Sequence, residues 1–222
     1  MIIIYISEFL NNVYTISCIW IVIWRTLLSL HPGTKEINSI LRLHFSHGIV
    51  SSILAILCLL QYVSENITIG CVLGYMLTDL SNMIINDFYY KINSYHTPTS
   101  RKIEYFHHSL CIIGSILSEK YTNYCLLDRN PLITVILAEI STPFLIAFRW
   151  TNQKNIILGS LFFVSFIGIR TIYQCIFFMP YIFNSCSYTI GYTFVIPYVG
   201  LQIVFTHQIV NKAIQTLNKI KN

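Results

Sequence analysis

Two adjacent histidines, His107 and His108, stand where a polar stretch passes into an apolar run that is long enough to enter a membrane. Burying ionisable side chains in hydrocarbon costs free energy, so such residues inside a membrane segment are candidates for a functional site. A positioned histidine can take a proton from an amine or a hydroxyl that attacks an activated acyl group, provided that a neighbour fixes its tautomer. The pair therefore indicates proton transfer within a membrane.

Three carboxylates could be that neighbour. Glu104 precedes His108 by one helical turn, while Asp79 and Glu139 lie inside other apolar segments. With a rise of about 1.5 Å per residue, His107 would lie roughly 6 Å, Asp79 roughly 12 Å and Glu139 roughly 16 Å from the same side of the membrane. We predict that His107, His108, Asp79 and Glu139 form a catalytic site in one cavity. The alternative is that both histidines are hydrogen-bonded at the level of the lipid headgroups.

Arg170 is a cation inside another apolar segment. The same rise places it roughly 21 Å from that side, close to the depth of Glu139. We predict an ion pair between Arg170 and Glu139 that fixes the register of two helices, and we favour this role over direct catalysis.

A metal site is the other chemistry that histidines suggest. The chain has one H-x-x-H, from His44 to His47, and one E-x-x-H, from Glu104 to His107. A di-iron site in a helical membrane protein needs paired ligand motifs of this kind. We therefore predict no metal, and we interpret His44 and His47 as interfacial residues beside a cytoplasmic loop.

The composition indicates that these groups belong to a membrane protein. The 222 residues are 55% hydrophobic and 10% charged, against roughly 25% charged in soluble domains. A spanning helix needs about 20 mostly apolar residues. We predict an all-α integral membrane protein with about seven transmembrane helices that form a bundle or barrel around a cytoplasm-facing cavity, over Phe9–Leu30, Phe45–Val63, Ile67–Asn86, Ile103–Ser118, Pro131–Trp150, Ile156–Phe178 and Tyr188–His207.

The basic residues orient this bundle. The net charge is +5, yet there is no arginine- or lysine-rich arm, so we expect no nucleic-acid partner. Most cations fall on one side of the predicted membrane, which places the N-terminus outside or in a lumen and the C-terminus in the cytoplasm. The one N-glycosylation sequence, at Asn66, then lies on the outer side, and so do Cys125 and Cys186, which could form a disulfide.

Several motifs together resemble one family. The His107-His108 pair is followed by the block Ala138–Phe144, with Glu139, Ser141, Thr142, Pro143 and Phe144, and then by Arg149 and Trp150; Gly74, Tyr75 and Asp79 fit the preceding helix. This set is similar to TLC-domain proteins, in particular the small TLC-domain-containing proteins and more distantly the ceramide synthases. The resemblance covers residues 39–211, after an N-terminal helix and loop over 1–38 and before a basic cytoplasmic tail over 212–222.

The resemblance implies a role in membrane lipid homeostasis. It implies a location in the endoplasmic reticulum, in another endomembrane or in the plasma membrane. It implies membrane lipids as partners and an acyl-CoA-dependent transfer to a sphingoid or phospholipid, with acyl-CoA as cosubstrate and no bound cofactor. Ceramide synthases carry a second acid where this chain has Thr142. A non-enzymatic protein that binds lipid or regulates membrane composition is therefore the alternative, and a seven-helix receptor is a third class with the same topology.

Overall fold

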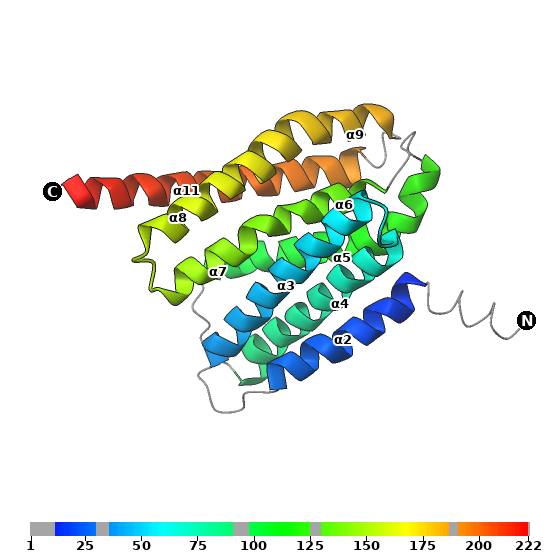
Figure 1. The fold of residues 1–222 in the computed structure, drawn as a ribbon, viewed down its shortest axis with the longest axis horizontal. Coiled ribbons are helices and arrows are strands. Elements are labelled where there is room, and N and C mark those ends of the chain that lie inside the picture. Colours follow the sequence, from blue (N-terminus) through cyan, green and yellow to red (C-terminus); the bar gives the residue numbers. More distant parts are fainter. Residues whose placement is uncertain (1–11, 30–35, 91–97, 125–129, 187–190, 222) are drawn as a thin grey trace, which may run out of the picture.

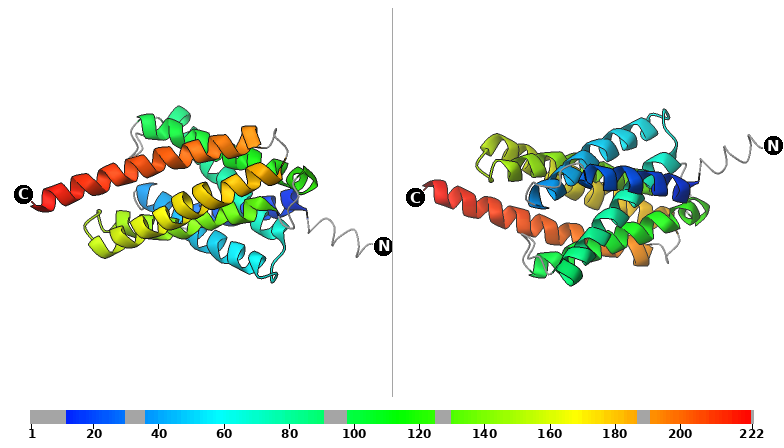
Figure 2. Two further views of the ribbon diagram at one scale, coloured as in Figure 1. Left: turned by 90° about the horizontal axis from the view of Figure 1, so that it is seen from above. Right: turned by 90° about the horizontal axis from the view of Figure 1, so that it is seen from below.

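The computed structural model describes residues 12–29, 36–90, 98–124, 130–186 and 191–221. These residues are almost entirely helical and form no strand, so the predicted all-α class is confirmed. The helices run roughly along one common direction and pack side by side (Figure 1). The end of α11 (Ile196–Lys221) extends beyond the other helices (Figure 2).

The first three helices form one side of the bundle. They are α2 (Val13–Ser29), α3 (Glu36–Leu59) and α4 (Glu65–Ile84), which continues into the wider turns of η1 (Ile85–Tyr90). α4 begins at Ser64, whose hydroxyl accepts a hydrogen bond from the backbone N–H of Ile67. This cap satisfies one of the N–H groups that a helix leaves unpaired at its start.

Gly74 lets α4 lie against α2. A Cβ atom added at Gly74 would lie 2.8 Å from the carbonyl oxygen of Ser17 and 2.8 Å from Cβ of Trp20. Only a residue without a side chain permits so close an approach, which is common between membrane helices. Trp24 of α2 is buried beside α4, where its indole N–H donates to the carbonyl of Cys71.

The helix over the predicted fifth span is interrupted. α6 (Pro131–Ile136) is followed by a 3₁₀ stretch, η2 (Leu137–Ser141), and then by α7 (Thr142–Trp150). Asn130 caps α6 by accepting from the N–H of Leu132, and Pro131 occupies the first helical position. The interruption comes directly before Pro143, whose ring cannot donate the hydrogen bond of a regular helix.

The remaining helices complete the bundle. α5 (Pro98–Tyr124) packs against α4, and α8 (Ile156–Ser165), η3 (Phe166–Phe178) and α9 (Met179–Ser185) form one continuous helix with π-helical turns in η3. η4 (Gly191–Val195) leads into α11. The parts of the predicted first and seventh spans at residues 9–11, 30 and 188–190 lie outside the described residues.

Five helices of the described residues are long and apolar enough to cross a membrane: Ile40–Leu59, Glu65–Phe88, Pro131–Trp150, Ile156–Ser185 and Thr193–Gln215. The helix Val13–Ser29 is apolar but shorter. α5 is not among the five, and it carries charged residues towards both of its ends. Five such helices fit a membrane protein.

The outer surface of the α8–η3 helix is apolar. Its exposed side chains include Ile156, Ile157, Val164, Ile176 and Phe177, each more than half exposed. Large exposed apolar surfaces are uncommon in soluble monomers, and in a bilayer they face lipid. This surface agrees with the assignment to a membrane.

Two predictions concern the end of the bundle that carries the turn between α3 and α4. Asn66 lies in the first turn of α4 and its side chain is partly buried. Cys186 is disulfide-bonded, and its predicted partner Cys125 lies outside the described residues.

Candidate functional site

A cavity of about 340 Å³ lies between α3, α4, α5, α7, α8, η3 and α11. Its walls are largely apolar, with Leu145, Phe148, Phe162, Phe166 and Phe205 among them. Its polar lining includes His44, His107, His108, Glu139, Ser141, Thr142 and Arg170. The cavity thus combines an apolar wall with a concentrated set of ionisable groups.

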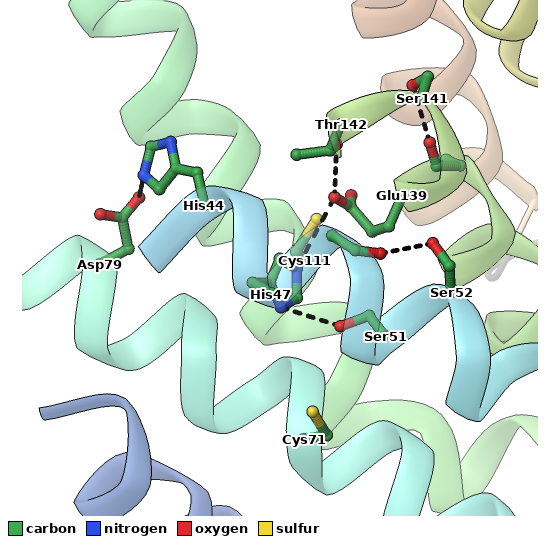
Figure 3. Close-up of polar contacts among 12 residues, drawn as sticks. His44, His47, Ser51, Ser52, Cys71, Asp79, Cys111, Glu139, Ser141 and Thr142 are labelled. Atoms are coloured by element: carbon green, nitrogen blue, oxygen red, sulfur yellow. Dashed lines mark hydrogen bonds and ion pairs between the residues drawn. The ribbon is translucent and has the colours of Figure 1, made fainter. Parts of the chain in front are cut away.

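Asp79 does not itself line this cavity but joins two histidines that do. It is 3% exposed, and its Oδ2 lies 2.8 Å from Nε2 of His108 and 3.2 Å from Nε2 of His44. The three side chains come from α4, α5 and α3, so the contact requires all three helices in their observed register. Figure 3 shows the contact between His44 and Asp79.

Both ring nitrogens of His108 are engaged. Nδ1 lies 2.8 Å from the carbonyl oxygen of Glu104, which can only accept, so Nδ1 carries the proton and donates. Nε2 faces Asp79, and a further proton is therefore shared between this nitrogen and the carboxylate. His108 has no nitrogen left for a substrate in this arrangement, so it serves to position Asp79.

His44 differs from His108 in this respect. Its Nε2 faces Asp79, which fixes the tautomer with the proton on Nε2. Within the described part of the chain, no hydrogen-bond partner lies at Nδ1. An imidazole with a carboxylate on one nitrogen and the other nitrogen unprotonated is the arrangement of a general base. His44 is not among the residues predicted from the sequence to take part in catalysis.

His107 lines the cavity without a comparable carboxylate contact. Its Nδ1 lies 3.8 Å from Sγ of Cys111, and its ring meets the rings of His108 and Phe205 edge to face. These are weak contacts that leave the tautomer of His107 undetermined.

Glu139 forms the centre of a second polar cluster, in η2. Its Oε2 accepts a hydrogen bond of 2.8 Å from the hydroxyl of Thr142 and lies 3.7 Å from Nε2 of His47, and its Oε1 lies 3.4 Å from Nη2 of Arg170. Figure 3 shows Glu139 between Thr142 and His47. The structure places the predicted partners Glu139 and Arg170 in contact.

Arg170 also has a role that was not predicted from the sequence. Its Nε donates to the carbonyl oxygen of Ala138 at 3.1 Å and to the hydroxyl of Ser141 at 3.2 Å. The 3₁₀ stretch changes the pattern of backbone hydrogen bonds in its helix, and Arg170 donates to one of the carbonyl oxygens there, that of Ala138. The guanidinium therefore holds the interrupted helix as well as pairing with Glu139.

His47 is fully buried, and the interpretation of this residue as interfacial is wrong. Its ring stacks on Tyr75 with 3.4 Å between ring centroids and 6° between planes, and its Nδ1 lies 2.9 Å from the hydroxyl of Ser51. His44, the other residue of the H-x-x-H spacing, lines the cavity. Neither the stacking nor the burial has a signal in the hydropathy of the chain.

The residues of the family motif that follow Glu139 lie partly at the cavity and partly against other helices. Ser141, Thr142 and Arg149 line the cavity, and the ring of Trp150 lies 4.9 Å from that of Phe45, centroid to centroid. Pro143 lies against Gly48 of α3, where an added Cβ would come within 2.8 Å of its Cδ. Phe144 is partly buried beside them in α7.

The cavity reaches the surface at the end of the bundle that holds the turn between α7 and α8. Gln153, Gln208 and Lys212 are exposed there and also line the cavity, together with Glu104 and Arg149. This mouth therefore carries charge of both signs, with two of its three charged residues basic.

A metal ion has no suitable site in the part of the chain that the structure describes: no three or more histidine, cysteine, aspartate or glutamate side chains converge in a way that could hold one. Comparisons of this chain with protein families, with curated proteins and with solved structures found no match.

Proposed function

We propose that this chain is a TLC-type membrane protein with seven transmembrane helices that takes a membrane lipid into the cavity and transfers an acyl group to it. The acyl donor is an acyl-CoA, and the acceptor is the amine or hydroxyl of a sphingoid base or a lysophospholipid. His44 is the general base of this reaction and Asp79 orients it.

The contact of His44 with Asp79 at the cavity wall is the observation that carries this proposal. A histidine acts as a base when one ring nitrogen donates its hydrogen to a fixed partner and the other nitrogen can reach the amine or hydroxyl that receives the acyl group. His108 supports the arrangement from the other side, because it holds the same oxygen of Asp79.

The reaction balances with these groups. Nδ1 of His44 takes the proton of the lipid N–H or O–H as that atom attacks the thioester carbonyl. The carbon–sulfur bond breaks, the acyl group forms an amide or ester, and the proton passes to the leaving thiolate to give free CoA. Arg170 lines the cavity, and its guanidinium can stabilise the negative charge that develops on the carbonyl oxygen.

The walls of the cavity fit a lipid. Aromatic and aliphatic side chains such as Phe148, Phe162 and Phe205 line its sides, and burial of a hydrocarbon chain against them gains about 0.8 kcal/mol per CH₂ group. The basic residues Arg149 and Lys212 at the mouth suit the phosphates of the donor or of a headgroup. Under the positive-inside rule this mouth opens to the cytoplasm, where acyl-CoA is available.

An acyl-transfer assay tests this function. Purified protein in lipid nanodiscs is incubated with radiolabelled palmitoyl-CoA and either sphinganine or lysophosphatidylcholine, and the labelled lipid product is measured. We expect product with wild type and a loss of about 100-fold or more with His44→Ala, since general-base catalysis contributes 10²- to 10⁴-fold. His207→Ala is the matched control, because His207 is exposed on α11 and does not line the cavity.

A lipid-binding protein without catalysis is the second candidate. It is favoured by the pairing of Glu139 with Arg170 and by the engagement of both nitrogens of His108, which are the contacts of a stable binding site. Native mass spectrometry of the purified protein distinguishes the two functions. Retained lipid without any turnover of palmitoyl-CoA on either acceptor would support binding alone and contradict transfer.

A further inference from the structure

A second, smaller cavity of about 30 Å³ lies deeper in the bundle than the mouth residues. It shares Met76, His107, Glu139 and Arg170 with the lining of the main cavity, so the two adjoin. Its volume exceeds the roughly 10–15 Å³ that one water molecule needs. We refer to it as the inner cavity.

Gln202 of α11 lines the inner cavity with an unsatisfied amide. The residue is 1% exposed, and neither Nε2 nor Oε1 has a hydrogen-bond partner in the described residues. A buried amide without partners is strongly unfavourable, so an unpaired amide beside a cavity indicates a missing partner in that cavity.

Gln174 shows what a structural glutamine looks like in the same bundle. It is fully buried, its Nε2 donates to the carbonyls of Thr134 and Val135 at 2.9 and 3.1 Å, and its Oε1 accepts from the hydroxyl of Tyr198. Every polar atom of that amide is paired within the chain. The contrast between these two buried glutamines sets Gln202 apart as a binding group.

The surroundings define the chemistry of the missing partner. Leu132, Val135 and Ile136 make part of the wall apolar, and the charges of Glu139 and Arg170 face each other. A further charge would therefore enter a buried site without a counter-ion. A group that both donates to Oε1 and accepts from Nε2 satisfies Gln202, and a hydroxyl does both with one oxygen.

We propose that the inner cavity binds an uncharged hydrogen-bonding group through Gln202: a water molecule when no lipid is bound, and the hydroxyl of the lipid when the main cavity is occupied. The lipid part of this inference rests on the proposed function and narrows its ligand to a lipid with a free hydroxyl. The water part does not depend on it.

A matched pair of probes tests the lipid part. Dodecan-1-ol and 1-methoxydodecane have the same chain, and only the alcohol has an O–H that can donate to Oε1. Binding of each to purified wild-type protein is measured by native mass spectrometry at equal concentrations. We expect wild type to bind the alcohol at least about 10-fold more tightly, as one hydrogen bond in a buried site permits. We expect Gln202→Met, which keeps the length of the side chain, to bind both probes alike.

Gln215→Met is the control variant, because Gln215 is exposed on the same helix and lines neither cavity. It should keep the preference for the alcohol. If Gln202→Met does not fold, Gln202→Asn takes its place, since the shorter side chain keeps the amide but withdraws it from the cavity, and it too should lose the preference.

The outcomes separate this inference from the proposed function. Equal binding of both probes by wild type, or an alcohol preference that survives in Gln202→Met, would overturn the hydroxyl subsite while leaving lipid binding intact. Binding of neither probe would count against both the lipid site and its hydroxyl subsite. The water part is decided by a high-resolution structure without added lipid: density hydrogen-bonded to Gln202 supports it, and a dry inner cavity refutes it.

Discussion

At the scale of single residues, the candidate site depends on one oxygen atom. Oδ2 of Asp79 faces Nε2 of both His44 and His108. Because His108 also donates from Nδ1 to a backbone carbonyl, its ring cannot rotate without breaking two hydrogen bonds, and Asp79 is held in place for His44. The site therefore contains a base, an orienting carboxylate and a residue that fixes the carboxylate.

Asp79→Asn tests whether the carboxylate orients His44, because the substitution removes the charge but keeps the shape of the side chain. The side chain keeps its size, but a neutral amide holds the two histidine N–H groups less strongly than a carboxylate, and it cannot stabilise the imidazolium that forms when His44 takes a proton. We expect palmitoyl transfer in nanodiscs to fall by about 100-fold or more, with the lipid still bound. Asp87→Asn is the control, because Asp87 pairs with Arg101 and not with His44 or His108. Equal losses in the two variants would argue against an orienting role of Asp79.

Arg170 should matter for stability through more than its charge. Arg170→Met removes the pair with Glu139 and the hydrogen bonds to Ala138 and Ser141, and breaking a buried pair costs about 3–5 kcal/mol. Arg170→Lys keeps a charge but lacks the fork that serves several acceptors, so it should also destabilise. Thermal unfolding in detergent micelles measures both.

The double variant Glu139→Gln, Arg170→Met tests how much of the loss of stability comes from the ion pair and how much from the other hydrogen bonds of Arg170. If the ion pair were the whole contribution, removing the second charge would restore most of the stability. We expect only partial recovery, because the carbonyl of Ala138 still loses its donor. Full recovery of the unfolding temperature would limit the role of Arg170 to the pair.

The residue-level predictions from sequence succeeded or failed for a physical reason. Counting the rise per residue brought Glu139 and Arg170 to similar depths, and the structure has them in contact. The apolar run began the predicted second span at Phe45, whereas α3 begins at Glu36. The longer helix includes His44, and hydropathy alone cannot show that a helix continues beyond its apolar part.

At the scale of elements, the irregular helices are the part that sequence could not supply. A proline such as Pro143 favours a kink, but its presence does not predict a 3₁₀ stretch over Leu137–Ser141. The π-helical turns of η3 had no signal, because they depend on what Arg170 and Gln174 contact across the bundle. Tertiary hydrogen bonds, rather than local propensity, determine these segments.

Glycine substitutions test the packing of α2 on α4. An added Cβ at Gly74 would lie 2.8 Å from a backbone oxygen of α2, whereas nothing lies within 4 Å of one added at Gly200. Gly74→Ala should therefore destabilise the protein by about 1–3 kcal/mol through overpacking. Gly200→Ala should be neutral or stabilising by up to about 1 kcal/mol, since alanine favours a helix. Unfolding in detergent compares them, and similar effects of the two substitutions would contradict this packing.

At the scale of the whole molecule, the chain order places the helix ends in two groups. The start of α3, the turn between α7 and α8 and the end of α11 lie towards one end, and the turn between α3 and α4 and the end of α9 lie towards the other (Figure 1). Arg42, Arg149 and Lys154 belong to the first end and the exposed Tyr62 to the second. Charge thus distinguishes the two ends, and the cavity opens at the basic one.

Cysteine labelling tests which end faces the cytoplasm. Lys154→Cys and Tyr62→Cys introduce thiols at exposed turns of opposite ends, and the unsubstituted protein gives the background from its own cysteines. In sealed right-side-out vesicles, or in microsomes whose outer face is cytoplasmic, a membrane-impermeant maleimide reaches one side only. The positive-inside rule places Lys154 on the cytoplasmic side, so we expect only Lys154→Cys to react in microsomes and only Tyr62→Cys in right-side-out vesicles. The reverse pattern would turn the mouth of the cavity away from the cytoplasm. A cytoplasmic acyl-CoA could then not reach His44, and lipid binding without acyl transfer would be the better assignment.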